Sequence, residues 1–209
     1  MHQNYIIGVT GGSGSGKTSF VRDLLIGFDE SEVCILTMDN YYFPRDQQST
    51  DPSGVRNFDL PESIDIQAFK SDLELLKLGT PVKRIEYTFN NEKKVAEEII
   101  INPAPVIIVE GLFVLFDQEL YKQIDLKLIV HVPDSIKCIR RIKRDKIERN
   151  YPVEDVLYRY EHHVLPTYRR FIEPFLDVVD FVINNNSNFD KALEVIKDHI
   201  KIKLQAISS

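Results

Sequence analysis

A short run near the N-terminus has the residue types and the spacing of a phosphate-binding loop. The run reads Gly11-Gly12-Ser13-Gly14-Ser15-Gly16-Lys17-Thr18, which is a glycine, four residues and then Gly-Lys-Thr. Its glycines let backbone N–H groups converge on an anion, Lys17 can reach the outer phosphates, and the Thr18 hydroxyl can join the coordination shell of Mg²⁺. Together with Ser19, the run predicts a site for a nucleoside triphosphate and Mg²⁺.

The segments on either side of this loop are those that would position such a site. Residues 5–10 form an apolar, β-branched run typical of a buried parallel strand, and residues 19–28 have apolar side chains at helical spacing. The loop therefore joins a strand to a helix N-terminus, where free amides and the helix dipole favour phosphate. A chance Gly/Ser-rich linker is the alternative, and the flanking pattern disfavours it.

Two carboxylates follow other predicted strands. Residues 33–38 and 106–109 read as buried strands, and Asp39 and Glu110 come at their ends. Ligands of open parallel sheets bind beyond the carboxyl ends of the strands, so both acids should emerge beside the phosphate loop. Asp39 is a candidate base for an attacking hydroxyl, and Glu110 is a candidate Mg²⁺ ligand. A turn or helix cap for Asp39 and a structural ion pair for Glu110 are the alternatives.

A basic segment, residues 137–149, stands out in a chain whose formal net charge is -6 at pH 7. At about 100° per residue, Lys137, Arg141 and Arg144 share one face of a helix. The opposite face carries three isoleucines, Ile136, Ile139 and Ile142. This pattern predicts a helix that packs through its isoleucines and presents its cations to a triphosphate, as a lid over about residues 137–152. A solvated surface helix is the alternative.

The composition limits the class of protein. A chain of 209 residues that is 43% hydrophobic and 28% charged fits one globular domain, residues 1–209. Its negative charge argues against a nucleic-acid or membrane-surface partner. Two cysteines are too few for a disulfide framework, and residues 1–4 lack the features of a signal peptide. We therefore expect a cytoplasmic protein that binds a small molecule.

The remaining periodicity predicts an α/β fold, with a P-loop NTPase-type parallel sheet of about five strands flanked by helices. The fourth and fifth strands are residues 126–132 and 178–183. The further helices are expected at residues 64–78, 134–149, 153 to about 175, and 190 to about 204. Adjacent His162 and His163 lack the spacing of a shared metal site and are interpreted as structural or surface residues.

Two stretches interrupt this alternation. Residues 42–61 are polar and rich in turn formers, which predicts a long loop. Residues 82–89 and 93–101 are strand-like, and Asn90-Asn91 between them tolerates a tight turn. We expect a small β-hairpin, within about residues 80–102, that forms a lobe over the substrate.

These parts together predict phosphoryl transfer from ATP to a hydroxyl group. Lys17 and the glycines would hold the phosphates, and Thr18 and Glu110 would hold Mg²⁺. Asp39 would accept the proton of the hydroxyl, while the basic helix would neutralise charge on the transferred group. The sequence therefore predicts a small-molecule kinase.

The order of the motifs resembles the uridine kinase (uridine–cytidine kinase) family, from the first strand to about residue 183. The blocks that carry the resemblance are the glycine-rich loop, Met38-Asp39-Asn40-Tyr41-Tyr42, Asn57-Phe58-Asp59-x-Pro61, Val109-Glu110-Gly111 and Arg140-Arg141-x-x-Arg144-Asp145-x-x-Glu148-Arg149. The resemblance implies transfer of the ATP γ-phosphate to the 5′-hydroxyl of a pyrimidine nucleoside in nucleotide salvage. It also implies a homo-oligomer, commonly a tetramer.

The resemblance further implies roles for single residues. Asp39 would be the base, Asp59 would bind the ribose hydroxyls, and Tyr42 and Phe58 would line the nucleoside site. The lid cations would be Arg141, Arg144 and Arg149.

The hairpin and the lid depart from the family pattern. The family usually has Tyr-Asp-Phe or Tyr-Asp-Tyr and then His and Arg, whereas this chain has Tyr87-Thr88-Phe89 and then Glu92 and Lys94. Tyr87, Phe89 and Glu92 remain candidate substrate contacts. A carboxylate accepts hydrogen bonds but donates none, so Glu92 would weaken recognition of uracil O4 and could favour the cytosine amino group. Tyr151 stands where the family often has another lid arginine.

Two other functions stay open. One is a related kinase of a non-nucleoside alcohol, similar to phosphoribulokinase or pantothenate kinase; Asp59 in its Asn-Phe-Asp setting disfavours it. The other is a nucleotide-dependent switch, but the chain lacks the Asn-Lys-x-Asp motif with which GTPases read guanine. Asp51-Pro52-Ser53-Gly54 fits the Asp-x-x-Gly pattern of such switches, yet lies in a turn-rich run where chance explains it. The choice between ATP and GTP also stays open.

Overall fold

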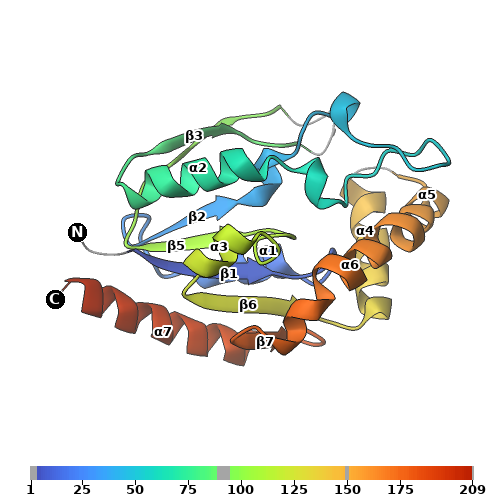
Figure 1. Cartoon of the computed structure of the whole chain (residues 1–209). Coiled ribbons are helices and arrows are strands. Elements are labelled where there is room, and N and C mark those ends of the chain that lie inside the picture. The colour runs from blue at the N-terminus through green and yellow to red at the C-terminus, as the bar shows by residue number, and fades with distance from the viewer. Residues whose placement is uncertain (1–3, 89–94, 149–150, 209) are drawn as a thin grey trace.

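The computed structural model describes residues 4–88, 95–148 and 151–208, and at its centre is a parallel β-sheet (Figure 1). Its strands lie in the order β2-β5-β1-β6-β7, and every neighbouring pair is parallel. Their bounds are β1 (Tyr5–Thr10), β2 (Val33–Thr37), β5 (Val106–Glu110), β6 (Leu126–His131) and β7 (Phe181–Asn184). The predicted five-stranded parallel sheet is confirmed. The last strand begins three residues later than expected.

The strand order puts β5 between the two strands that precede the phosphate loop and Asp39. Glu110, the last residue of β5, is in register with Val9 of β1 on one side and with Thr37 of β2 on the other. The sequence predicts parallel strands but does not say which strand lies in the middle. Because β5 lies between β1 and β2, Glu110 ends between the Lys17 and Asp39 segments.

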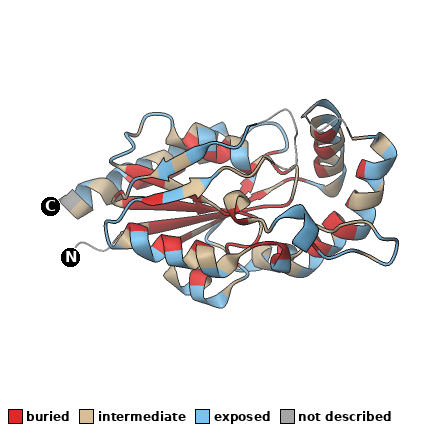
Figure 2. Cartoon of the chain, turned by 90° about the horizontal axis from the view of Figure 1, so that it is seen from above, coloured by how far each residue is buried: buried red, intermediate tan, exposed pale blue. Residues whose placement is uncertain are grey.

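Helices cover both faces of the sheet, which explains why its strands are apolar throughout (Figure 2). On one face, α1 (Lys17–Leu25) and α7 (Asp190–Ser208) pack against the strands in one core cluster. On the other face, α2 (Ile66–Lys77) and α3 (Gln118–Gln123) belong to a second cluster. Alternate residues of β5 separate the clusters, since Ile108 joins the first and Ile107 and Val109 join the second.

The helix ends follow local rules. Helix α2 begins after Asp65, whose side chain accepts from the Ala68 amide at 2.9 Å, and it ends before Gly79, which has a φ of 78°. The helix predicted over residues 19–28 extends too far at its C-terminal end. Helix α1 ends at Leu25, and Gly27 follows with a φ of 98°. Helix α3 has no counterpart among the predictions, and α7 is longer than predicted.

A helical arm lies beyond the carboxyl ends of the strands (Figure 1). It consists of α4 (Asp134–Glu148), α5 (Val153–Arg159), a π-helical turn (Tyr160–Val164) and α6 (Leu165–Phe171). The continuous helix predicted from residue 153 to about 175 is therefore wrong in detail. The π-helical turn interrupts it, and a 3₁₀ turn at Glu173–Asp177 follows its end.

The predicted hairpin is present as β3 (Val82–Ile85) paired antiparallel with β4 (Glu98–Ile101). Both strands are shorter than expected, and the Asn90-Asn91 turn lies outside the described residues. Asp72 of α2 ties the hairpin to the body, since it accepts hydrogen bonds from Arg84 and from the Tyr41 hydroxyl. The predicted long loop after Tyr42 contains short 3₁₀ turns at Arg45–Gln47 and Pro61–Ser63.

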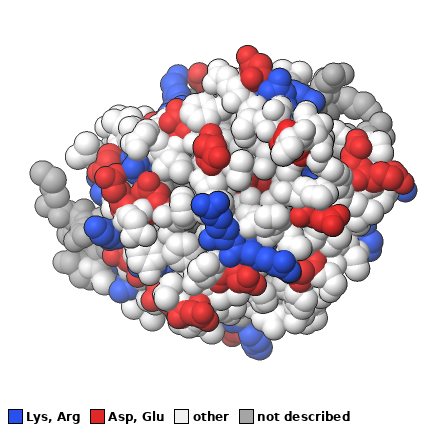
Figure 3. Space-filling view, turned by 45° about the vertical axis from the view of Figure 1, so that its right-hand side comes forward, with Lys and Arg blue, Asp and Glu red and all other residues white. Residues whose placement is uncertain are grey.

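The described helices include none with both the length and the apolar character needed to cross a membrane. The face of the molecule in Figure 3 mixes acidic with basic side chains.

Replacement of Phe69 by alanine should test the packing of α2 on the sheet. Phe69 has no exposed surface, and its loss would leave a cavity, so we expect the free energy of unfolding to fall by about 3–5 kcal/mol. The measurement is urea denaturation followed by circular dichroism. Leu78→Ala is the control, because Leu78 is 74% exposed and its truncation should change stability by less than about 0.5 kcal/mol. Equal effects of the two variants would contradict the assigned core.

Candidate functional site

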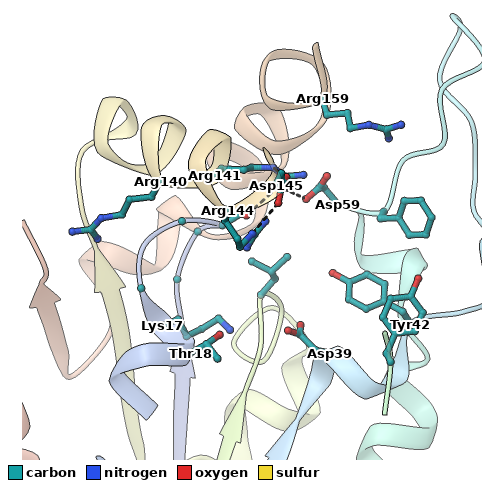
Figure 4. Close-up of a pocket in the computed structure, with 18 of the residues that line it drawn as sticks. Lys17, Thr18, Asp39, Tyr42, Asp59, Arg140, Arg141, Arg144, Asp145 and Arg159 are labelled. Carbon is teal, nitrogen blue, oxygen red and sulfur yellow. Dashed lines mark hydrogen bonds and ion pairs between the residues drawn. The ribbon is translucent and has the colours of Figure 1, made fainter. Parts of the chain in front are cut away.

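A cavity of about 620 Å³ opens at the carboxyl ends of the strands (Figure 4). Most of the predicted site residues line it: Gly11, Gly12, Ser13, Gly14, Gly16, Lys17, Thr18, Ser19, Asp39, Tyr42, Phe58, Asp59, Tyr87, Arg141 and Arg144. Ser15 and Glu110 are buried and are not among the lining residues. Phe89, Glu92 and Arg149 lie outside the described residues. The structure therefore brings the predicted phosphate-loop, strand-end and loop residues together around one cavity.

The phosphate loop owes its shape to glycine. Gly14 and Gly16 have φ of 84° and 93°, which side chains other than glycine rarely allow. Gly14 also lies against the backbone of Lys137, so a Cβ there would collide with the carbonyl group of α4. Gly16 immediately precedes α1, and the loop thus leads into a helix N-terminus as the sequence predicts.

Lys17 and Glu110 form a buried ion pair at the base of the cavity. Lys17 is 8% exposed and Glu110 is 2% exposed; Lys17 Nζ donates to Glu110 Oε1, while Glu110 Oε2 accepts from the Thr37 hydroxyl at 3.0 Å. Burial alone would lower the pKa of Lys17, but the charges of Glu110 and Asp39 outweigh it and raise this pKa. Lys17 is therefore an ammonium cation, held beside the cavity between two carboxylates.

Asp39 lies in a 3₁₀ turn, Met38–Tyr41, directly after β2. Thr37 Oγ1 caps this turn by accepting from the Asp39 amide at 3.4 Å. Figure 4 shows the Asp39 carboxylate facing Lys17 and Thr18 across the base of the cavity. An acid placed there can accept a proton from a hydroxyl group that approaches a phosphate on the loop.

The oxygen ligands at this point suit Mg²⁺. Thr18 offers a hydroxyl and Glu110 a carboxylate, the hard donors that Mg²⁺ prefers. The described residues hold no cluster of three or more His, Cys, Asp or Glu side chains of the kind that could bind a metal alone. Mg²⁺ beside a nucleotide is commonly held by one or two protein groups and completes its shell with phosphate oxygens and water.

Helix α4 presents its cations to the cavity, but through a different packing from the one predicted. Lys137 and Arg141 are 3% and 7% exposed, whereas Ile139 is 53% exposed. The prediction that the helix packs through its isoleucine face is therefore wrong, whereas Arg141 and Arg144 of the cationic face line the cavity. The cause is the set of acceptors beneath the helix, which compensates the burial of positive charge. Lys137 pairs with Asp134 at 2.8 Å and lies over the Tyr168 ring, 3.1 Å from its centroid.

Arg141 links the two ends of the cavity. One of its guanidinium nitrogens, Nη1, donates to the Ser13 hydroxyl of the phosphate loop at 3.0 Å and to Asp59 Oδ1 at 3.2 Å. Asp145, one turn further along α4, accepts from Arg144 Nε at 2.9 Å and pairs with Arg141 (Figure 4). Asp59 and Asp145 thus orient both arginines toward the cavity.

The end of the cavity away from the phosphate loop is aromatic. The Tyr42 and Tyr87 rings are stacked, with centroids 5.2 Å apart and planes 30° apart, and Phe58 also lines this end. Burial and the charges of Asp39 and Asp59 raise the pKa of Tyr42 well above its usual value. Neutral, stacked rings beside a carboxylate suit a flat, polar ligand such as a nucleoside.

Several residues that line the cavity are not predicted from the sequence. Arg45, Leu112, Tyr151 and Arg159 have no motif that assigns them to the cavity, although Tyr151 is noted above as a departure from the family pattern. Arg159 is the clearest case, because it arrives from α5 and its Nη1 donates to the Arg56 carbonyl at 2.9 Å. No local pattern marks it. Arg140 lines the cavity too and is fixed by the carbonyls of Ser15 and Asn185.

Gly111→Ala should displace Asp39. Gly111 follows Glu110, and a Cβ at Gly111 would collide with Cβ of Met38, the neighbour of Asp39. If Asp39 takes part in the chemistry, a shift of about 1 Å should lower kcat up to about 100-fold while the KM for ATP changes little. Steady-state kinetics checks this. Gly79→Ala is the control, since it strains a positive φ but has no neighbour within 4 Å. A normal kcat for folded Gly111→Ala would contradict the expectation.

Comparisons with known proteins agree with this geometry. The model of the phosphoribulokinase / uridine kinase family matches residues 6–192. Uridine kinase of Borreliella burgdorferi (strain ZS7) is 36% identical over 196 residues, 94% of each chain, and that of Streptococcus pyogenes serotype M5 (strain Manfredo) is 37% identical over 195 residues, 93% of this chain and 94% of the other. D-glycerate 3-kinase from Cryptococcus neoformans shares the fold, with a TM-score of 0.65 at 15% identity over 90% of this chain and 89% of its own. The chain belongs to the phosphoribulokinase / uridine kinase family.

Proposed function

We propose that the chain is a nucleoside kinase that transfers the γ-phosphate of ATP to the 5′-hydroxyl of a pyrimidine nucleoside, uridine or cytidine. The observation that carries the proposal is the place of Asp39, which faces Lys17 and Thr18 on one side and borders the aromatic end of the cavity on the other. The relatives are named uridine kinases and match this chain over nearly their whole length, which supports the same substrate class.

The phosphate end of the cavity would bind ATP. The glycine-rich loop and Ser19 would surround the phosphates with backbone amides, and Lys17 would exchange part of its contact with Glu110 for the outer phosphates. Thr18 and Glu110 would hold Mg²⁺, which when bound neutralises charge on the β- and γ-phosphates. Arg141 and Arg144, oriented by Asp145, would stabilise negative charge on the transferred group, as would Arg149.

The other end would bind the nucleoside. Asp59 would accept hydrogen bonds from the ribose hydroxyls while Arg141 holds it in place. The base would contact the stacked Tyr42 and Tyr87 rings and Phe58. With the sugar so oriented, the 5′-hydroxyl would approach Asp39, which would accept its proton as the oxygen attacks the γ-phosphorus; the bond from the γ-phosphorus to the β,γ-bridging oxygen would break, and ADP would leave. Phe89 and Glu92 would complete the base site from the hairpin.

The finer parts of the proposal rest on the family resemblance. They are a role in pyrimidine salvage and a homo-oligomer, commonly a tetramer; the cytoplasmic location is an expectation from the sequence. The division of the single domain into a body, a hairpin insertion at about residues 80–102 and a lid at about residues 137–152 also stays a prediction.

A panel of acceptors tests the substrate class. The protein should convert uridine or cytidine to the 5′-monophosphate with Mg-ATP, and ribulose 5-phosphate, D-glycerate and pantothenate should be poor acceptors. Because Glu92 accepts but does not donate hydrogen bonds, we expect no strong preference for uridine over cytidine. Chromatography of the products measures this. Uridine turnover well above that of cytidine would refute the Glu92 argument, and turnover of another alcohol alone would refute the nucleoside.

Asp39→Asn tests the base. The amide cannot take the proton, so kcat should fall by about 10²–10⁴-fold, whereas ATP affinity measured by titration calorimetry should change little. Asp46→Asn is the control, because Asp46 is an exposed residue of the loop that follows Asp39. Near-normal turnover by Asp39→Asn would remove Asp39 from this role.

A further inference from the structure

The loop that leads to Phe58 and Asp59 is closed on itself by backbone hydrogen bonds. We call residues 49–57 the acceptor loop. Asn57 N donates to Ser49 O at 2.9 Å, Thr50 and Arg56 form an isolated antiparallel bridge, and Asp51 N donates to Val55 O at 2.9 Å. Phe58 and Asp59 follow directly and line the cavity. The position of this loop therefore determines the backbone positions of Phe58 and Asp59.

Asp51 is the centre of the acceptor loop. Its Oδ1 accepts from the backbone amides of Ser53 and Val55, at 2.9 Å each, which shapes the tip of the loop. Its Oδ2 bonds across the sequence to the Tyr158 hydroxyl and to His163 Nε2, at 2.8 Å each. Partial burial would raise the pKa of this carboxyl, but these hydrogen bonds lower it to about 2. Asp51 is thus a carboxylate that joins the loop to the helical arm.

His163 makes this contact from the helical arm. It lies in the π-helical turn, and its side chain is 1% exposed, whereas the side chain of adjacent His162 is 51% exposed. The extra residue of a π-turn changes the direction of side chains, and such turns are common at functional sites. Because Asp51 accepts hydrogen bonds, His163 donates from Nε2. Asp51 offsets part of the cost of burying this imidazole by accepting from Nε2, while Nδ1 is buried without a hydrogen-bond partner.

Two further contacts join the helical arm to the acceptor loop and to the residues that follow it. Arg159, which lines the cavity, donates to the Arg56 carbonyl of the acceptor loop at 2.9 Å. Asp59, just after the loop, receives Arg141 of α4. Figure 4 shows Arg159 and Asp59 on the side of Tyr42, away from Lys17 and Thr18. The arm and the acceptor loop thus meet at the end of the cavity that faces the acceptor, not at the phosphate loop.

We propose that Asp51 and His163 are positioning residues for the acceptor: their contact fixes the acceptor loop against the helical arm, and thereby places Phe58 and Asp59 for acceptor binding. Neither residue lines the cavity, so they act through the loop. The inference rests on the proposed function only in taking the aromatic end as the acceptor end. It assigns His163 and Asp51, which belong to no motif discussed above as functional, a role in acceptor affinity.

Kinetics of His163→Leu tests the proposal on the full chain, with whichever acceptor the wild-type protein phosphorylates. The leucine fills the site but cannot donate, so the KM for the acceptor should rise about tenfold, while the KM for ATP and kcat stay within about twofold. His163→Gln, whose amide can donate to Asp51, should restore at least part of the affinity. His162→Gln is the matched control, because it removes the adjacent imidazole and changes neither of the two groups that bond Asp51; the ring it removes lies 4.5 Å from that of Tyr158.

A double-mutant cycle tests whether the two residues act as a pair. If they do, Asp51→Ala combined with His163→Leu should raise the acceptor KM no more than the stronger single change. Tyr158→Phe removes one bond to Asp51 without opening a cavity and should raise the acceptor KM about threefold. If His163→Leu fails to fold, the acceptor KM of Tyr158→Phe tests the proposal instead.

Hydrogen exchange provides a measure that does not depend on the substrate. The amides of Ser53 and Val55 should exchange faster in His163→Leu than in the wild type, and no faster in His162→Gln. If the wild type phosphorylates no nucleoside, the proposed function fails, but this test and the kinetics with another alcohol still apply. Unchanged exchange in folded His163→Leu, an unchanged acceptor KM, or equal increases in the KM for ATP and for the acceptor would overturn the positioning role.

Discussion

The buried pair of Lys17 and Glu110 is the interaction on which the site depends. Glu110 ends β5 and Lys17 begins α1; both charges have almost no exposure, and each would be costly to bury alone. Their pairing is geometrically available because β5 lies between β1 and β2, so that Glu110 ends beside the helix that begins at Lys17. The ammonium is therefore held next to the phosphate loop before any ligand arrives. A ligand phosphate then competes with a carboxylate for a cation already in place, and little reorganisation is required.

The basic helix shows how charge can reverse an amphipathic pattern. Periodicity separates the cations of α4 from its isoleucines, but it does not say which side faces the body. The structure buries Lys137 and Arg141, because Asp134, the Tyr168 ring, Ser13 and Asp59 receive them. Asp134 lies three residues before Lys137 on the same helix, but the Tyr168 ring, Ser13 and Asp59 come from distant segments that local sequence rules do not identify. Arg141 is consequently a structural link as well as a candidate contact for phosphate.

The parts of the site whose residues lie close together in the chain can be predicted from the sequence. The glycine-rich loop, the buried strands and the acids at their ends are each defined within about ten residues, and the structure brings Lys17, Asp39 and Thr18 together as expected. Prediction from the sequence failed where contacts are long-range. The position of β5 between β1 and β2, the inward face of α4 and the entry of Arg159 into the cavity all depend on packing between distant segments. The bond between Asp51 and His163 joins residues 112 positions apart, one from a turn-rich loop and one from a π-helical turn that periodicity reads as ordinary helix.

The two ends of the cavity differ in how they are assembled. The phosphate end is made by one loop and the strand ends beside it, and hydrogen bonds of the sheet fix their spacing. The end proposed to bind the acceptor includes the acceptor loop, Tyr87 after β3 and the helical arm, and side-chain contacts of Arg159 and Asp51 join the arm to the loop. Side-chain contacts can change one at a time without disturbing the parallel sheet. The fold is shared with D-glycerate 3-kinase from Cryptococcus neoformans at 15% identity, and a shared fold can carry different specificities because they are set by the side chains of the site.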